Sequence, residues 1–461
     1  MTVPSYLTAA LAYIDQWLAH QNKIDTQTPA HSFALCYKGD IIFNKSYGIA
    51  DLKTQAPVTN DHLFRVASHS KTFTAVALFQ LAEVDKIKIT DPIVQYLSFL
   101  SDNPDPKIQQ VTIQQILGHQ AGLIRDGADP SYWILERDYP TADEIIQYFK
   151  TEPLTIAPET CFKYSNFGYG LLGLLIEHVS GLSYADYIQQ HMIEPLKLSH
   201  IGADHADQEP QPYVTGYTSK SPDGRQIAID MCMPADGLAA ATGFYANAEN
   251  LCRFYAALMP GTDLLLSDTS KHMMMTQIQR IPGEATARTY GLGLLVEKIH
   301  GQSCYGHVGC MPGCMSKTLF TPDTELTASL LTNSNRAPAA MLQSGIWQII
   351  DFFKTHYEEN SPYEKYAGRF YDMWDIFDYV PLGDKIYIAS PNYWEPFSNC
   401  TELTHLSDDT FIISKDVGFG SYQEKVTFIF ANDSLRKVNH AGYPKYNEAD
   451  YNAYLGKLAQ R

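Results

Sequence analysis

The sequence predicts an α/β fold in two domains, and three features of the 461-residue chain support this prediction. The first part alternates short β-rich runs with strongly helical ones, as an α/β domain does. A mainly helical lobe follows at about 109–200, after which strands return. Near residue 361, helical spacing gives way to short β-type runs between Gly, Asp or Asn turns. We therefore expect a larger domain at 1–355 and a small antiparallel β-barrel or sandwich at 361–461.

The first elements can be placed in order along the chain. The N-terminal run MTVPSYLTAALAYIDQWLAHQ has apolar residues at helical spacing and predicts an amphipathic helix. Residues 31–52 predict two strands joined by a turn at Lys38-Gly39-Asp40. A helix is expected to begin near Ser68. Because its sequence, KTFTAVALFQLAEV, is apolar on nearly every face, this helix should be buried inside the domain.

The later elements alternate between helices and strands. Loops rich in Pro, Gly and Asp, such as 125–133, break the helical lobe, and a loop-rich segment occupies 203–236. We expect helices at AENLCRFYAALM and AAMLQSGIWQIIDFFKTHY, and strands at GLGLLVEKI and SKTLFTPDTELTASLLTN. The small domain contributes the strand-like runs KIYIAS, TELTHLSDDTFIISK and EKVTFIFAN.

Composition and charge narrow the classes of function. Apolar residues make up 45% of the chain and charged residues 18%, which favours a folded protein with a large core. The formal charge is −17 and no basic run matches a row of phosphates, so neither nucleic acid nor a membrane is expected as a partner. We find no secretory leader and no apolar run long enough to span a bilayer, and therefore expect a cytoplasmic protein. The oligomeric state is not indicated.

The eight cysteines are scattered, and in the absence of a leader we interpret them as mostly free thiols. Cys310 and Cys314 form the tightest pair, but no second pair at ligand spacing completes a zinc site. Gly291 and Gly293 lack the third glycine of a dinucleotide-binding fingerprint. The sequence therefore predicts neither a metal nor an organic cofactor.

The first candidate for catalysis is the run Ser68-His69-Ser70-Lys71. A serine three residues before a lysine at the start of a helix places Oγ and Nζ on one face, about one turn apart. Burial favours the neutral amine, which can take the serine proton and make the hydroxyl a nucleophile. Backbone N–H groups at the helix start, that of Ser68 among them, can form part of an oxyanion hole. Because such a short pattern also arises by chance, it needs support from other parts of the chain.

Tyr164 and Asn166 stand two residues apart at the start of a second apolar helix, so both side chains can point into one cleft. The phenol can relay a proton between nucleophile and leaving group, and the amide can bind a substrate amide. The structural alternative is a half-buried tyrosine that only packs.

The third group is His307, Gly309 and Cys310 in the run YGHVGCMPGCMS. Glycine in a strand lets a backbone or a ligand approach closely, so a substrate can lie along this edge with His307 facing it. The N–H of Cys310 would be the second oxyanion donor. A glycine-rich hairpin with a surface histidine is the structural alternative. We expect His119, at a predicted helix end, to be structural.

These three groups, in this order, resemble those of the β-lactamase-like superfamily: class C β-lactamases, penicillin-binding proteins, serine esterases and D-amino-acid peptidases. Other segments are also similar to the family's, namely LFRVASHSKTFTAVALFQL, ILGHQAGL, MIEPLKL, GLAAATGFYANAENLCRFYAAL and YGLGLLV. The resemblance covers about residues 10–350. It implies a transpeptidase-like domain, with an antiparallel sheet, flanking helices and a helical lobe.

The resemblance also implies a role for each residue. Ser68 would form the acyl-enzyme with Lys71 as general base, Tyr164 would be the second acid/base, and Asn166 would contact the acyl amide. His307 replaces the lysine that the third motif often has. Since histidine is often neutral at pH 7, penicillin hydrolysis and strict carboxypeptidase action are less favoured. Histidine here is similar to the esterase and D-aminopeptidase-like members.

The small domain, which begins YAGRFYDMWD, resembles the lipocalin-like barrel appended to some D-peptidases and peptide-cyclising relatives. In those relatives the domain borders the active-site cleft, which implies a limit on substrate size. A stabilising or oligomerising module is the alternative.

We therefore predict a serine hydrolase that forms an acyl-enzyme on Ser68 and cleaves an amide or ester. The expected substrate is a small molecule or a small peptide, including one that contains a D-residue. Two alternatives stay open. In one, the acyl group passes to an amine, as in an acyltransferase or peptide cyclase. In the other, the protein is a penicillin-binding sensor that is acylated without turnover.

Overall fold

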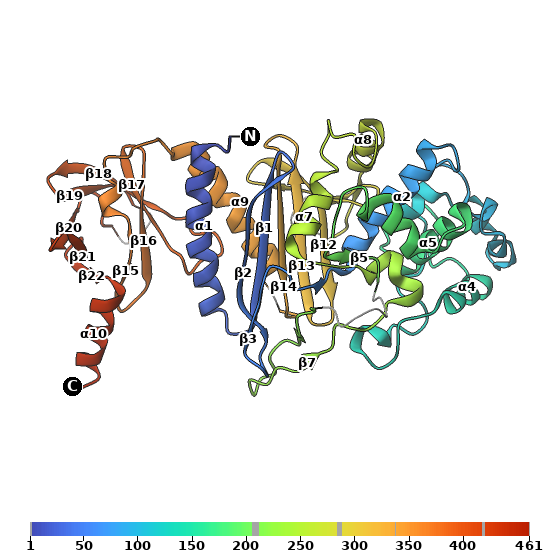
Figure 1. Cartoon of the computed structure of the whole chain (residues 1–461), viewed down its shortest axis with the longest axis horizontal. Coiled ribbons are helices and arrows are strands. Elements are labelled where there is room, and N and C mark those ends of the chain that lie inside the picture. The colour runs from blue at the N-terminus through green and yellow to red at the C-terminus, as the bar shows by residue number, and fades with distance from the viewer. Residues whose placement is uncertain (1, 205–211, 284–287, 337, 417–419, 461) are drawn as a thin grey trace. The chain divides into compact units, whose positions relative to one another are not determined.

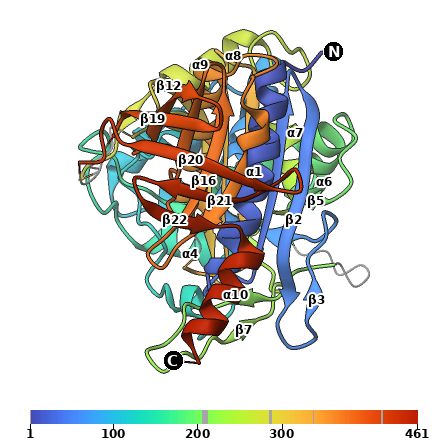
Figure 2. The ribbon, with the colours of Figure 1, turned by 90° about the vertical axis from the view of Figure 1, so that its left-hand side faces the viewer.

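The computed structural model describes residues 2–204, 212–283, 288–336, 338–416 and 420–460 (Figures 1 and 2). The predicted α/β fold followed by an antiparallel β-barrel is confirmed. The chain forms two compact units, Thr26–Ala340, and Met1–Asp25 together with Met341–Arg461. Helix α1 (Ser5–Ile24) and nearly all of α9 (Ala339–His356) group with the barrel, although the sequence analysis assigns them to the larger domain. The boundaries 1–355 and 361–461 stay a prediction.

The larger unit is built on a nine-stranded antiparallel sheet of order β3-β2-β1-β14-β13-β12-β11-β10-β9. The predicted hairpin at 31–52 is present, with Lys38 and Gly39 at positive φ in its turn. Strand β1 pairs with β14, so the first and last strands of this unit lie side by side (Figure 1). The strands are β1 (Ala30–Tyr37), β2 (Asp40–Asp51), β3 (Ala56–Pro57), β9 (Gln279–Arg280), β10 (Thr289–Tyr290), β11 (Leu295–Ile299), β12 (Gln302–Met311), β13 (Cys314–Thr321) and β14 (Leu326–Thr332).

Helix α2 (Ser70–Glu83) is the most enclosed helix, as its sequence predicts. Every residue from Ser70 to Leu81 is buried except Gln80. The helix begins two residues later than expected, because Ala67–His69 forms a 3-10 turn. It packs against α5 and α6 of the helical lobe (Figure 1). The other helices of this unit are α3 (Ile113–Leu117), α4 (Ala142–Thr151), α5 (Asn166–Ser180), α6 (Tyr184–Ile188), α7 (Ala248–Ala256) and α8 (Asp268–Thr276).

Short strand pairings connect the lobe to the rest of this unit. In a three-stranded sheet, β8 lies between β4 and β5, so the chain just before the nucleophile candidate pairs with residues far along the sequence. A further pair forms within the loop-rich segment at 203–236, of which 205–211 lie outside the described residues. These strands are β4 (Phe64–Arg65), β5 (Ile201–Gly202), β6 (Gly216–Tyr217), β7 (Ala228–Ile229) and β8 (Tyr245–Ala246).

The smaller unit contains a closed antiparallel barrel of eight strands in sequence order, so the predicted barrel is confirmed and the alternative of a sandwich is not. Aromatic and aliphatic side chains, such as Phe370, Tyr379, Phe411 and Phe428, fill its interior, as an eight-stranded barrel permits. Its strands are β15 (Gly368–Tyr371), β16 (Ile376–Leu382), β17 (Lys385–Ala389), β18 (Thr401–Ser407), β19 (Thr410–Lys415), β20 (Lys425–Ala431), β21 (Ser434–His440) and β22 (Tyr443–Tyr446), followed by α10 (Glu448–Leu458). The up-and-down order is that of lipocalins, but the lipocalin-like assignment stays a prediction.

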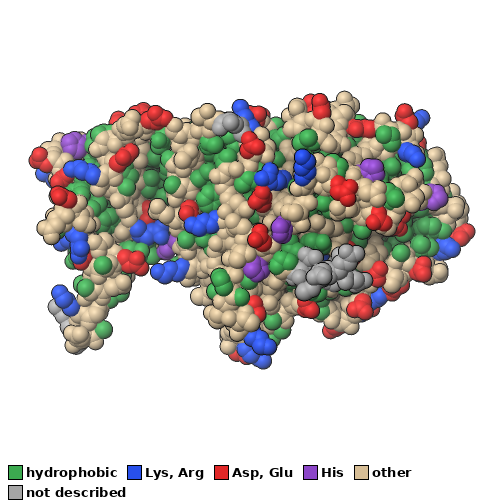
Figure 3. Space-filling view, viewed as in Figure 1, with side chains coloured by type: hydrophobic (Ala, Val, Ile, Leu, Met, Phe, Trp, Pro, Cys, Tyr) green, Lys and Arg blue, Asp and Glu red, His purple; other side chains and the backbone are tan. Residues whose placement is uncertain are grey.

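The surface and the helices bear on possible partners. On the face seen in Figure 3, acidic and basic side chains are interspersed, so on this face the charge of −17 is not gathered in one cluster. Of the helices in the described ranges, none combines the length and the apolarity needed to cross a bilayer.

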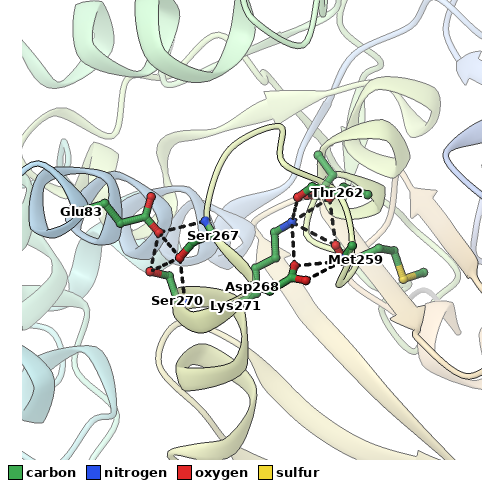
Figure 4. Close-up of polar contacts among 9 residues, drawn as sticks. Glu83, Met259, Thr262, Ser267, Asp268, Ser270 and Lys271 are labelled. Atoms are coloured by element: carbon green, nitrogen blue, oxygen red, sulfur yellow. Dashed lines mark hydrogen bonds and ion pairs between the residues drawn. The ribbon is translucent and has the colours of Figure 1, made fainter.

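Helix α8 is anchored at its N-terminus by polar contacts (Figure 4). Oε1 of Glu83, the last residue of α2, accepts hydrogen bonds from the N–H of Ser267 at 2.9 Å and from Ser270 Oγ at 2.6 Å. Lys271 is 1% exposed, and its ammonium donates to the carbonyls of Met259 and Thr262. These contacts join α8 to α2 and close the loop between α7 and α8.

The anchored helix supports the turn that lies against the reactive end of α2. The carbonyl of Met274 in α8 accepts a hydrogen bond from Leu292. Gly293, in the same turn, has φ of 79°, and a Cβ there would overlap Ala75 and meet the carbonyl oxygen of Lys71. Only glycine fits this approach, so the backbone of residues 291–294 packs directly on α2.

We predict that Lys271→Met lowers the free energy of unfolding by about 2 kcal/mol, because it removes the hydrogen bonds that the buried Lys271 Nζ donates to the carbonyls of Met259 and Thr262. Urea unfolding followed by circular dichroism would measure the change. Lys86→Met, at an exposed position near the end of α2, is the control and should stay within about 0.5 kcal/mol of wild type. Equal stability of the two variants would contradict the anchoring role of Lys271.

Candidate active site

Ser68 lies in the 3-10 turn directly before α2. The preceding residue, Ala67, has φ of 47°, in the left-handed region that a residue with a Cβ adopts only when its surroundings hold it there. The N–H of Val66 donates to the carbonyl of Phe244 at 2.9 Å and so ties this turn to the chain before α7. The position of the Ser68 hydroxyl is therefore set by backbone contacts over a long sequence distance.

Lys71 is fully buried one turn further along α2. Its Nζ lies 3.3 Å from Ser68 Oγ, 2.7 Å from Asn166 Oδ1 and 2.7 Å from the carbonyl oxygen of Ala241. Burial lowers the pKa of Lys71 well below its usual range. A neutral amine has two N–H groups and one lone pair. The two carbonyl acceptors take the N–H groups, which leaves the lone pair for the proton of Ser68.

Tyr164 approaches the same hydroxyl from the helical lobe, with its phenol oxygen 2.9 Å from Ser68 Oγ. Helix α5 begins two residues later, at Asn166, and Ser165 is its N-cap, whose Oγ accepts the N–H of Gly168 at 2.8 Å. Burial raises the pKa of Tyr164, so the phenol keeps its proton at neutral pH. Ser68 Oγ therefore lies between an amine that can accept a proton and a phenol that can donate one.

The amide of Asn166 has two partners within the protein, and the sequence analysis predicts neither of them. Its Oδ1 faces Lys71, whereas its Nδ2 donates to Asp126 Oδ1 at 2.6 Å. An amide carries two N–H groups, so one remains for the predicted contact with a substrate amide.

His307 on β12 is 2% exposed, and the protein itself occupies both of its ring nitrogens. Nδ1 lies 2.7 Å from the carbonyl oxygen of Val308, an acceptor, which assigns the ring proton to Nδ1. Nε2 then accepts from the hydroxyl of Tyr290 at 2.9 Å. Burial, and secondarily the neighbouring Lys71, lower the pKa of His307 to about 3, so the imidazole is neutral at pH 7.

Gly309 permits a close backbone approach, and the partner that it meets here is the nucleophile turn. A Cβ at Gly309 would overlap the carbonyl oxygen of Val66 and Ser316 Oγ. The absence of a side chain thus lets β12 lie directly against the segment that carries Ser68. The sequence analysis expects a substrate to lie along the strand at Gly309, and that contact stays a prediction.

A pocket of about 420 Å³ brings the candidate residues together. Ser68, Tyr164, Asn166, His307 and Cys310 all contribute to its wall, while Lys71 lies buried behind Ser68. The wall also contains the aromatic residues Trp133, Phe162 and Tyr290, the apolar residues Ile281, Leu295 and Val308, and two arginines, Arg125 and Arg288. The charged residues known to line the pocket are thus both cationic.

Several contributors to this site were not singled out from the sequence. Arg125 and Asp126 fall in a segment interpreted only as a loop, and Tyr290 begins a run interpreted only as a strand. His119, expected to be structural, accepts the N–H of Ser165 at Nδ1 at 3.2 Å, and its ring lies 4.2 Å from that of Tyr164. It therefore supports Tyr164. The only sequence signal for a role of His119 was its position in ILGHQAGL, a segment similar to one of the family's.

No metal site is evident in the part of the chain that the structure describes. Within those ranges, no group of three or more His, Cys, Asp or Glu side chains is arranged to hold a metal ion. The eight cysteines are free thiols there, with Cys310 exposed.

Comparison with known proteins is consistent with this geometry. Residues 14–347 match the family described as Beta-lactamase. Among curated relatives, the putative penicillin-binding protein PbpX of Bacillus subtilis is 28% identical over 318 residues, which are 68% of this chain and 73% of that protein. The protein Flp of Staphylococcus aureus is 27% identical over 37% of this chain, and the match spans only 34% of its own length.

Solved structures share the fold. The octameric penicillin-binding protein homologue from Pyrococcus abyssi has a TM-score of 0.63 at 20% identity, over 95% of this chain and 99% of that one. The D-stereospecific amidohydrolase from a Streptomyces species has a TM-score of 0.62 at 25% identity, over 73% of this chain and 97% of its own. The first likeness includes the smaller unit, whereas the second leaves about a quarter of this chain unmatched.

We predict that Gly309→Ala displaces the nucleophile turn from β12, because the new methyl group would overlap the carbonyl of Val66. Overpacking of this kind costs about 1–3 kcal/mol of stability. The rate at which a fluorophosphonate labels Ser68 should fall by about tenfold or more, measured by mass spectrometry. Gly456→Ala, where no atom lies within 4 Å of the new Cβ, is the control. Wild-type labelling of Gly309→Ala would contradict the close approach.

We predict that stability falls as the pH decreases below 6.5. His69, His119 and His307 are buried, and burial lowers the pKa of each below 6.5. As the pH falls below that value, the unfolded chain binds protons that the folded chain does not take up. For His307 this window extends from pH 6.5 down to about 3. Each such histidine costs up to about 1.4 kcal/mol per pH unit within its window.

The contribution of His307 can be measured with His307→Gln. Unfolding free energies at pH 5 to 8 should show a slope that is smaller by about 1.4 kcal/mol per pH unit below pH 6 than that of the wild type. At pH 8 the imidazole is neutral in both the folded and the unfolded chain. The difference in unfolding free energy between His307→Gln and the wild type at this pH therefore reports packing alone. Parallel slopes for the two proteins would show that His307 is not held neutral.

Proposed function

Because the chain belongs to the β-lactamase family of serine hydrolases, we propose that it forms an acyl-enzyme on Ser68 and cleaves an amide or ester bond. The observation that carries this proposal is the position of Ser68 Oγ, 3.3 Å from Lys71 Nζ and 2.9 Å from the phenol of Tyr164. A proton acceptor and a proton donor on one hydroxyl are what acyl transfer through serine requires.

Acylation begins when Ser68 Oγ attacks the substrate carbonyl and its proton passes to the lone pair of Lys71. The carbonyl oxygen becomes an oxyanion, for which the N–H groups of Ser68 and Cys310 are the proposed donors. Collapse of this intermediate breaks the bond to the leaving group and leaves an ester on Ser68. Lys71, now an ammonium ion, holds the proton that the leaving group needs.

Tyr164 is the proposed route for that proton. Since the phenol is protonated, it can donate to the leaving nitrogen or oxygen and recover a proton from Lys71, so no charge accumulates. In deacylation the same path runs in reverse: a water molecule gives up its proton and its oxygen forms the new bond to the acyl carbon. Ser68 leaves as a hydroxyl, and the free acid is released.

We further propose a small peptide, including one with a D-residue, as the substrate. The similarity to a D-stereospecific amidohydrolase supports an amide substrate, and the aromatic wall of the pocket suits an apolar side chain. A neutral His307 cannot supply the permanent charge that a lysine gives to a substrate carboxylate. Arg125 and Arg288 place positive charge in the same pocket, so a substrate with an anionic group also fits this proposal.

The proposal is tested by covalent labelling of the intact protein, with a fluorophosphonate and a penicillin-type probe read by mass spectrometry. Wild type should gain one label on Ser68, and Ser68→Ala should gain none while it keeps its circular dichroism spectrum. Unchanged labelling of Ser68→Ala would defeat the assignment of the nucleophile.

Separate variants test the two proton-transfer groups. Lys71→Ala and Tyr164→Phe should each slow acylation or deacylation by about 10²-fold or more, as loss of a general acid or base does. A panel of esters and of D- and L-peptide amides, followed over time, would show which acyl groups are released. An adduct that forms with every member of the panel and never turns over would favour the sensor alternative instead.

A further inference from the structure

Asp126 lies in the loop that leads from α3 toward α4, and its carboxylate accepts hydrogen bonds from several donors. Oδ1 accepts from Asn166 Nδ2 at 2.6 Å and from Trp133 Nε1 at 3.0 Å, and Oδ2 pairs with Arg125 Nε at 3.0 Å. The Asp126 side chain is 12% exposed, whereas that of its ion-pair partner Arg125 is 66% exposed. Neither the motifs of the sequence nor the proposed chemistry gives this carboxylate a role.

The same loop also holds the backbone of Asn166. The carbonyl of Arg125 accepts the N–H of Asn166 at 2.8 Å and that of Phe167 at 3.2 Å, at the first turn of α5. Backbone and side chain of Asn166 are therefore both fixed by two consecutive residues, Arg125 and Asp126. This arrangement leaves the amide little freedom to move.

The carboxylate also determines which way the amide faces. Asn166 stands between Lys71, a donor to its Oδ1, and Asp126, an acceptor from its Nδ2. A flipped amide would place N–H groups against the amine and its carbonyl against the carboxylate, and both contacts would be lost. Without Asp126, only Lys71 would orient the amide.

We propose that Asp126 is a positioning residue for acylation: by fixing the amide of Asn166, it holds the lone pair of Lys71 on the hydroxyl of Ser68. This inference rests on the proposed function, since it assigns no reaction to Asp126 itself. Asp126 acts through Asn166, and Asn166 acts on the orientation of the base.

The charge of Asp126 has a second effect on the same base. Burial lowers the pKa of Lys71, the Asp126 carboxylate opposes this shift, and the Arg125 guanidinium adds to it. The uncharged titratable groups around Lys71 are Tyr164, Tyr169, His119 and His307. Removal of the carboxylate leaves Arg125 unopposed, so the pKa of Lys71 falls further. The amine then becomes neutral at a lower pH.

The test is the pH profile of Ser68 labelling by a fluorophosphonate in Asp126→Asn, a variant of nearly the same shape. The plateau rate should fall about tenfold, because the base is less well oriented. The acidic limb of the profile should move to lower pH, because Lys71 loses its proton more easily. A loss of folding alone would lower the plateau without moving the limb.

Two further variants separate geometry from charge. Asp126→Glu keeps the charge but displaces the amide, so the plateau should fall while the limb stays near its wild-type pH. Asp129→Asn removes a carboxylate from the same loop, where it accepts the N–H of Ser131 and pairs with the half-buried Arg137, and should leave both plateau and limb as in wild type.

A double-mutant cycle tests whether Asp126 acts through Asn166. In an Asn166→Ala background, Asp126→Asn should slow labelling by clearly less than it does in wild type. Rate losses that multiply fully in the double variant, or a wild-type profile in Asp126→Asn, would overturn the inference. Failure of the wild-type protein to be labelled on Ser68 would overturn the proposed function and the inference with it. Labelled wild type with an unaffected Asp126→Asn would overturn the inference alone.

Discussion

The burial of one amine, that of Lys71, is the constraint on which the candidate site depends. An exposed lysine is an ammonium ion at neutral pH and cannot accept a proton, so the base exists only because the fold removes water from it. The desolvation arises because Lys71 lies in the buried part of α2, where the neighbouring residues of the helix are buried as well. The sheet, the helical lobe and the glycine-bearing turns against α2 all contribute to this burial.

Long-range backbone contacts complete the arrangement. The nucleophile turn is tied to Phe244, β12 reaches it through Gly309, and α8 supports the turn that packs on α2 through Gly293. Each contact joins segments that are far apart in the chain. The geometry of Lys71 and Tyr164 around the Ser68 hydroxyl is thus a property of the whole larger unit, and it should be sensitive to changes well outside the pocket.

Most of the fold and the main side chains of the candidate site could be predicted from the sequence, because their signals are local. The spacing of Ser68 and Lys71, the pairing of Tyr164 with Asn166 and the alternation of the strands all lie within short windows. The carbonyl of Ala241, the hydroxyl of Tyr290 and the carboxylate of Asp126 have no such window, since only tertiary folding brings them to the site. The grouping of α1 and α9 with the barrel is likewise invisible to local patterns.

The two hydrogen bonds from Lys71 to Asn166 and Ala241 have a consequence for the lifetime of the protein. During turnover an activated ester sits one side chain away from a neutral amine, and amines attack esters to form stable amides. Such a transfer from oxygen to nitrogen would inactivate the site permanently. Because both N–H groups are held by carbonyl acceptors, the lone pair points at the serine oxygen and not at the acyl carbon. The contacts that orient the amine of Lys71 as a base therefore also prevent its acylation by the ester on Ser68.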